Sequence, residues 1–260
     1  MQLVFQTRFS YVGKLGWRSR TSDNPEIALA ADRLAARLAL FEHVALASIA
    51  DQTDDDFRLH VLVAEALPAT TRDQLRALCD SYLGADRVTI LERSPSRSWN
   101  QMRNAVLDQF SESEVIVQSA LDDDDGVAVD FVELCKAEAT RQSQAEHYAG
   151  DASFLNFATG VRLEWKGGVI SDVSADHRPL YAPGYALVGP AGTSASALVQ
   201  NSSFDRVPRC TSIATDRPMY AKSVHGFNDR QSLADAPDAP VERPEDIETF
   251  LPMLIGRLPD

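Results

Sequence analysis

The first half of the chain alternates short runs of β-branched and apolar residues with segments whose apolar residues recur at helical spacing. Strands that alternate with helices in this way form βαβ units, which build a mainly parallel sheet. The pattern therefore predicts an α/β fold with helices on the faces of the sheet. The expected strands cover residues 2–9, 57–63, 87–91 and 114–121, and the expected helices cover residues 25–50, 70–83 and 98–110.

Two of these helices carry further signals. Pro25 suits the first turn of the long helix, in which a break is expected near His43. Thr71 stands three residues before Gln74, which is the spacing of a capping box at the start of the next helix.

The second half has a different pattern. A helix is expected over residues 131–147, and short aromatic and β-branched runs at 148–157, 161–165 and 169–173 predict antiparallel additions to the sheet. From Pro179 onward Pro, Gly, Ser and Asp accumulate, which predicts mobile loops. No linker divides the chain, so we expect a single domain over residues 1–260.

Charge and composition narrow the classes of partner. The 260 residues are 44% hydrophobic, enough for a substantial core, and carry a formal net charge of −13. That charge repels a phosphate backbone, so nucleic acid is not expected as a partner. An anionic substrate would have to be met locally by a divalent cation or by a few arginines.

Cysteine usage and hydropathy bear on the compartment. The three cysteines show neither a disulfide framework nor zinc spacing, which suits a reducing cytoplasm. The chain starts without a secretory pattern, and no apolar stretch is long enough to span a bilayer. We therefore expect a cytoplasmic protein without a transmembrane segment, and peripheral contact with the inner membrane face stays open.

Four consecutive carboxylates, Asp122 to Asp125, follow the strand expected at 114–121. Neighbouring charges about 6 Å apart repel by about 3 kcal/mol at an effective dielectric near 20, so folding requires something to offset them. A bound Mg²⁺ or Mn²⁺ would do so. If strand geometry continued, alternation would place Asp122 and Asp124 on one face and let two oxygens converge on one ion. The carboxyl ends of strands are also where ligands bind in open α/β sheets.

Two simpler explanations compete with cation binding. The first is that the run precedes a helix, where Asp is favoured as the N-cap. A single Asp would suffice for that role, so capping does not require four. A calcium loop of EF-hand type is rejected, because aligning Gly126 with the invariant glycine puts Leu121 and Val132 at positions that require ligands.

The order of motifs resembles that of GT-A-fold, family-2-type glycosyltransferases, in particular the branch named putative rhamnosyltransferases. The acidic run after an apolar strand resembles their DxD segment, and the likeness covers residues 2–135 well. Ala47 and Ala120 depart from residues common in that branch, proline and arginine. The other matching segments are Ala47-Ser48-Ile49 with Gln52-Thr53, Trp99-Asn100-Gln101-Met102-Arg103-Asn104-Ala105, Arg8-Phe9, and Val224-His225-Gly226-Phe227-Asn228.

The resemblance implies a GT-A-like, Rossmann-related, mainly parallel sheet flanked by helices, with an irregular acceptor-side C-terminal third. Within the single domain it implies a nucleotide-sugar-binding half at 1–130 and an acceptor half at 131–260. It also implies a metal-dependent glycosyltransferase that moves a sugar, rhamnose by family, from a nucleotide-sugar to a hydroxyl acceptor such as a carbohydrate. Such a reaction would serve polysaccharide or glycoconjugate synthesis. A divalent cation, Mn²⁺ or Mg²⁺, would act as a Lewis acid on the leaving diphosphate.

Residue roles follow from the matching positions. Substrate contacts are expected from Arg8, Arg103, Asn104, Asp122 and Asp123, and metal contacts from Asp124, Asp125 and His225. Each has a plainer alternative: Arg8 as a surface charge, Arg103 and Asn104 as a solvated helix face, and His225 as a structural histidine.

An inverting transferase also requires a carboxylate base for the acceptor hydroxyl. Asp176 and Asp216 are the catalytic candidates, with Asp205 as a third.

Two rival functions belong to other classes. One is a non-catalytic nucleotide-sugar or cation-binding protein, in which no base completes the site. The other is a metal-dependent phosphotransferase or nucleotidyltransferase, which would need a second carboxylate cluster that the sequence does not reveal.

Overall fold

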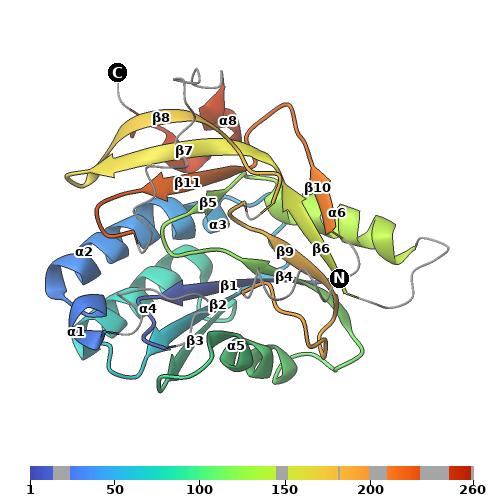
Figure 1. The fold of residues 1–260 in the computed structure, drawn as a ribbon, viewed down its shortest axis with the longest axis horizontal. Helices are drawn as coiled ribbons and strands as arrows, with labels where there is room; N and C mark the ends of the chain where they lie inside the picture. Colours follow the sequence, from blue (N-terminus) through green and yellow to red (C-terminus); the bar gives the residue numbers. More distant parts are fainter. Residues whose placement is uncertain (14–23, 145–151, 181, 199–209, 229–245, 259–260) are drawn as a thin grey trace.

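A seven-stranded sheet runs through the molecule with helices on both faces, and a smaller four-stranded sheet lies beside it (Figure 1). The structure is a computed structural model that describes residues 1–13, 24–144, 152–180, 182–198, 210–228 and 246–258. The large sheet has the order β10-β6-β9-β4-β1-β2-β3, and every neighbouring pair except those with β9 is parallel. Its strands are β1 (Leu3–Phe9), β2 (Phe57–Ala64), β3 (Val88–Arg93), β4 (Val115–Ala120), β6 (Ser153–Phe157), β9 (Ala186–Pro190) and β10 (Cys210–Ile213).

The first four strands lie where the hydrophobic pattern placed them. They pair in parallel in the order β3-β2-β1-β4, so the direction of strand addition reverses between β1 and β4. This is the strand order of the nucleotide-binding half of a doubly wound fold, whose ligands bind where the order reverses. The predicted fold class, a mainly parallel α/β sheet flanked by helices, is confirmed.

The main core lies on the face of the large sheet that carries Phe5, Phe9, Leu59, Val61 and Val117. These positions alternate along their strands, so burying them fixes which face of each strand meets the helices. Helices α4 (Ala69–Leu83) and α6 (Phe131–Ser143) contribute apolar residues to this core. On the opposite face α5 (Ser98–Leu107) packs against β2 and β3 through Met102 and Ala105.

The long N-terminal helix predicted over 25–50 is interrupted. It consists of α1 (Pro25–Ala28), α2 (Ala31–Leu40), the π-helical turn η1 (Phe41–Leu46) and α3 (Ala47–Ala50). Asn24 caps the start, because its side-chain oxygen accepts hydrogen bonds from the backbone N–H groups of Glu26 and Ile27. The irregularity predicted near His43 is the π-helical turn.

The capping box predicted at Thr71 is wrong. Helix α4 begins at Ala69, its N-cap is Pro68, and no side chain caps it. Thr71 therefore lies inside the first turn, three positions after the N-cap that the box would require it to be.

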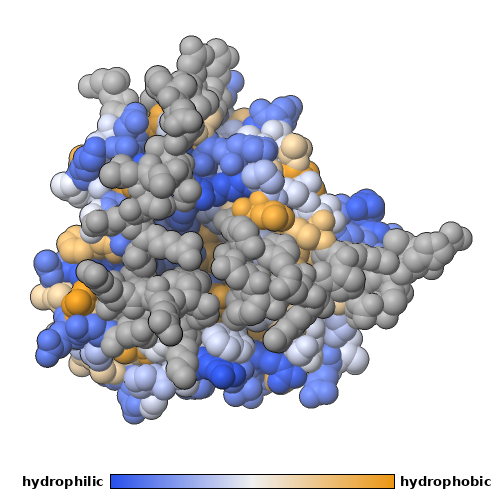
Figure 2. Space-filling model, viewed as in Figure 1, coloured by the Kyte–Doolittle hydropathy of each residue, from blue (hydrophilic) through white to orange (hydrophobic). Residues whose placement is uncertain are grey.

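The small sheet has the order β5-β11-β7-β8, formed by β5 (Gly126–Val127), β11 (Tyr220–Val224), β7 (Thr159–Lys166) and β8 (Val169–His177). Its apolar face, with Val161, Leu163 and Val173, joins the main core and meets α8 (Ile247–Phe250) and the 3₁₀ turn η4 (Pro252–Leu254). The other face carries polar side chains, among them Arg162, Ser174 and Lys222, and many of the coloured residues in the upper part of Figure 2 are hydrophilic.

The C-terminal third is more regular than its composition indicated. β9 is inserted between β4 and β6 as the antiparallel strand of the large sheet, and β10 and β11 are parallel additions. The prediction of mobile loops from Pro179 onward is therefore wrong for 186–190, 210–213 and 220–224. Ala186, Leu187 and Val188 supply the apolar residues that bury β9, a run too short to outweigh the surrounding Gly and Pro. Among the described residues, no helix is long and apolar enough to cross a bilayer.

His60 makes the fold sensitive to acid. Its side chain is completely buried on β2, and burial lowers its pKa from 6.5 to about 4. Because the unfolded chain binds the extra proton between these two values, stability is present above pH 6.5 and is lost as pH falls toward 4. We expect a loss of about 3 kcal/mol across this window.

Urea unfolding of His60→Leu between pH 7 and pH 4 measures this effect. The variant should lose less stability than the wild type, whereas His177→Gln, a change at an exposed histidine, should follow the wild type. Parallel pH profiles of the wild type and His60→Leu would contradict the assignment.

Candidate active site

The acidic run forms a turn between the two sheets. Strand β4 ends at Ala120, and the backbone N–H of Asp125 donates to the carbonyl oxygen of Asp122 over 3.2 Å before β5 begins at Gly126. The alternation expected for a continued strand is therefore wrong, because the chain reverses within the run.

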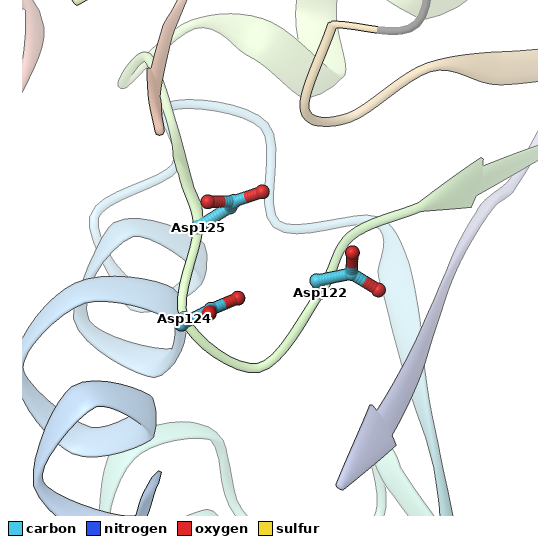
Figure 3. A group of neighbouring side chains, drawn as sticks. All are labelled: Asp122, Asp124 and Asp125. Atoms are coloured by element: carbon cyan, nitrogen blue, oxygen red, sulfur yellow. The ribbon is translucent and has the colours of Figure 1, made fainter. Parts of the chain in front are cut away.

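The turn brings together three of the four carboxylates. Asp122, Asp124 and Asp125 each offer one oxygen, and these oxygens lie within 4.8 Å of one another. Asp124 and Asp125 extend from one arm of the turn toward the other arm, which carries Asp122 (Figure 3). The Asp122 side chain is 45% exposed, whereas those of Asp124 and Asp125 are 6% and 4% exposed. A ligand would thus approach from the side of Asp122.

Three cationic side chains from three separate elements offset most of the negative charge. Arg8 of β1 contacts Asp122 at 3.0 Å, and Lys222 of β11 contacts Asp125 at 3.0 Å. Arg37 of α2 contacts Asp124 at 2.7 Å and also pairs with Asp123. A bound metal is therefore not needed for this run to fold, which corrects the argument from repulsion alone. Every carboxylate of the run thus has a cationic partner, but the four carboxylates share three cations.

Burial and the surrounding charges give two buried carboxylates, Asp124 and Asp125, different pKa values. Burial alone would raise the pKa of Asp124, but the Arg37 guanidinium and the His225 imidazole outweigh it and hold that pKa well below its usual value. Burial raises the pKa of Asp125 to about 7; Lys222 opposes this shift, and Asp124 and Asp122 add to it. Asp124 is thus a permanent anion, whereas Asp125 gains most from a nearby cation.

His225 lies against Asp124 and outside the three-carboxylate group. Its Nε2 is 2.8 Å from Asp124 Oδ2, and its Nδ1 accepts a hydrogen bond from the backbone N–H of Phe227. Because Nδ1 accepts, the proton of the neutral ring is on Nε2 and is donated to Asp124. In this geometry His225 orients the Asp124 carboxylate. The predicted contact of His225 with a metal through Nε2 would require Nε2 to lose its proton.

Asp123 does not belong to the group of three carboxylates whose oxygens converge. Its side chain has no exposed surface, and Oδ2 accepts a hydrogen bond from Arg37 Nε at 3.1 Å. In the structure Asp123 binds Arg37, and its predicted substrate contact stays a prediction.

Arg103 and Asn104 are not brought to the acidic turn. Arg103 Nη2 and Nε donate to the carbonyl oxygens of Gly192 and Thr193, 2.9 and 3.2 Å away. This segment follows β9, whose Pro190 pairs with Val115 at the opposite end of β4 from Asp122. Asn104 is exposed on the same helix. Arg103 thus holds residues 192–193, and its predicted donor contact stays a prediction.

The candidates for a catalytic base lie in different surroundings. Asp176 of β8 accepts hydrogen bonds from Arg178 Nε at 2.6 Å and from the Tyr220 hydroxyl at 3.0 Å. Burial and Asp176 raise the pKa of Tyr220, and the charge of Asp125 also contributes. Asp216 is exposed in a turn before β11, and Asp205 lies outside the described residues.

Sequence reasoning missed Arg37 and Lys222. Arg33 and Arg37 are spaced four apart beside the apolar stripe of α2, which is a weak signal that both face inward. Lys222 carries no comparable signal, because its partner Asp125 lies 97 positions away in the chain.

The sequence matches a family model described as "Putative rhamnosyl transferase" over residues 2–236. No curated protein matches the sequence.

Solved structures with related folds share little sequence with this chain. The first 349 residues of TarS from S. aureus superpose with a TM-score of 0.49 at 11% identity, covering 86% of this chain and 60% of that one. Longer TarS gives 0.45 at 10% identity, with 86% and 36% covered. Francisella tularensis 2-C-methyl-D-erythritol 4-phosphate cytidylyltransferase gives 0.36 at 11% identity, with 80% and 89% covered. The chain thus spans between about a third and three fifths of the TarS chains.

Arg37 is the partner on which the turn depends most. Arg37→Met leaves the buried Asp123 and Asp124 without their guanidinium, so we expect a loss of about 3–5 kcal/mol in the free energy of unfolding. The matched control is Arg141→Met, which removes a helical arginine paired with Glu138 at the surface and should change stability little. Urea unfolding at pH 7 compares the two variants. Equal effects would show that the buried pairs contribute no more than the exposed pair.

Proposed function

This chain belongs to the family described as putative rhamnosyl transferases, and from this premise we propose a metal-dependent transfer of a sugar from a nucleotide-sugar to a hydroxyl acceptor. The family description names rhamnose as the transferred sugar. The acceptor is proposed as a carbohydrate, with Mn²⁺ or Mg²⁺ as the cofactor.

One observation carries this proposal: three carboxylates converge at the carboxyl end of β4, beside β1. The order of the sheet reverses between these two strands, and ligands of open α/β sheets bind at such a point. Among the described residues, Asp122, Asp124 and Asp125 form the single acidic group of this kind. A nucleotidyltransferase with two acidic clusters therefore finds less support.

The residues of the turn fit a hard divalent cation. Mg²⁺ and Mn²⁺ prefer carboxylate oxygens, and Asp122, Asp124 and Asp125 offer three of them. When bound, such an ion would supply positive charge to the leaving diphosphate. Arg8 and Lys222 lie at the edges of the group and are proposed to turn toward the phosphates once their carboxylates bind the ion.

Asp176 is proposed as the acceptor-side base. It lies on the polar face of the small sheet, in the same cross-strand row as Gly160 and Tyr220, and this row neighbours the one that contains Lys222. Asp216 is exposed and makes no hydrogen bond or ion pair with the described residues of the acidic turn. The hydrogen bonds from Arg178 and Tyr220 would hold the carboxylate of Asp176 in a fixed orientation.

Two substitutions separate binding from transfer. Asp125→Asn removes one cation ligand. We therefore expect Mn²⁺ to bind at least about tenfold more weakly and donor turnover to be lost. Asp176→Asn should leave binding of nucleoside diphosphates with Mn²⁺ unchanged and lower kcat by at least about 100-fold, the typical contribution of a positioned base.

The control is Asp54→Asn, which also removes an aspartate paired with a lysine, Lys136, but outside the acidic turn. Calorimetry with nucleoside diphosphates and assays of donor hydrolysis and transfer make the measurement. Nucleotide-sugar binding with no turnover in the wild type would favour the rival reading of a binding protein. Full transferase activity of Asp125→Asn would contradict the metal-dependent mechanism.

A further inference from the structure

Arg162 is a buried charge with little compensation. The residue is 8% exposed, and its Nε has no hydrogen-bond partner among the described residues. The nearest carboxylate oxygen in an ion pair, on Glu164, is 3.9 Å from Nη2, beyond hydrogen-bonding distance. That carboxylate is already bound by Lys166 at 2.6 Å. Arg8, Arg37 and Arg178, in contrast, each bind a carboxylate at 3.0 Å or less.

The position of Arg162 connects it to the acidic turn. On the small sheet Arg162 of β7 is the register partner of Lys222 on β11 and of Ser174 on β8. Partners in register project from the same face, so Arg162 stands beside the lysine that contacts Asp125. Two residues along β7, Gly160 is the partner of Asp176. Arg162 thus belongs to the polar face that joins the turn to the proposed base.

A buried guanidinium without a bound anion costs stability, and such a cost is typical of sites that bind a ligand. The fork of N–H donors suits a phosphate or carboxylate group. Lys222 next to it makes the local potential more positive, which also favours an anion.

The donor diphosphate is the less fitting anion. Neighbouring strands are about 4.8 Å apart, so the backbone of Arg162, which is one strand beyond Lys222, lies roughly 10 Å from that of Asp125. A diphosphate in contact with a cation at the turn would meet Lys222 first. Arg162 lies farther out, toward Asp176, where the acceptor hydroxyl has to be deprotonated.

We propose that Arg162 binds an anionic group of the acceptor, a phosphate or a carboxylate, and so selects a charged acceptor. That the anion belongs to an acceptor rests on the proposed function, but anion binding at Arg162 can be tested without turnover.

The test titrates inorganic phosphate, in EDTA, into the wild type, Arg162→Gln, Arg162→Lys and the surface control Arg141→Gln. We expect phosphate binding to weaken about tenfold or more in Arg162→Gln and to be largely retained in Arg162→Lys and Arg141→Gln. Because Arg162 has no close partner in the part of the chain that the structure describes, Arg162→Gln without ligand should melt about 2–4 °C higher than the wild type. A residue with a purely structural role would shift the melting temperature downward.

A second titration identifies the source of the anion. With nucleoside diphosphate and Mn²⁺ at saturation, phosphate should still bind the wild type, and Arg162→Gln should bind the nucleotide within about twofold of the wild type. Competition between phosphate and nucleotide, or a matching loss of nucleotide affinity in Arg162→Gln, would assign the anion to the donor and overturn the proposal. Unchanged phosphate binding in Arg162→Gln would overturn it as well.

Failure of the proposed function has a different signature. In that case the wild type would bind no nucleoside diphosphate with Mn²⁺, while the phosphate titration in EDTA would still decide whether Arg162 binds an anion.

Discussion

Four adjacent carboxylates can enter a folded structure only if their mutual repulsion is offset, and here side chains from three distant elements do this. Arg8 comes from the first strand, Arg37 from the helix after it, and Lys222 from the last strand of the small sheet. The acidic turn therefore joins both sheets and α2 in one network. Arg37 binds both Asp123 and Asp124, so one guanidinium holds two adjacent residues of the turn.

This network also prepares the site for its proposed ligands. Three cationic side chains face four carboxylates, which leaves the turn with a net negative charge, and His225 Nε2 donates to Asp124. A divalent cation would change the sign of that balance and make the turn attractive to a diphosphate. Asp122 is partly exposed, whereas Asp124 and Asp125 are buried, so a ligand would reach the site from the side of Asp122. Beside it, the polar face with Arg162 and Asp176 belongs to the smaller sheet, which separates the proposed acceptor region from the donor region.

Local sequence patterns were sufficient for the first four strands, because each is an apolar run bounded by turn residues. They were also sufficient to place Asp122 to Asp125 at the end of a strand. They failed where distant contacts decide the structure: β9 enters the sheet between β4 and β6 despite its Gly and Pro, and the acidic run reverses direction where alternation assumed a straight strand. The partners Arg37 and Lys222 are far from the acidic run in the chain, so no local pattern indicates them. Arg103 matched a motif, yet its guanidinium binds residues 192–193 at the other end of β4.

The central claim is that the three carboxylates hold a divalent cation which in turn binds a nucleoside diphosphate. Calorimetric titration of Mn²⁺ into the wild type, with and without saturating nucleoside diphosphate, tests it most directly. Two ligands that share a contact must strengthen each other's binding by the same factor. The structure predicts one Mn²⁺ per chain, bound at least about fivefold more tightly when the nucleotide is present, and the reciprocal gain for the nucleotide. Nucleotide binding of equal affinity in Mn²⁺ and in EDTA would contradict it.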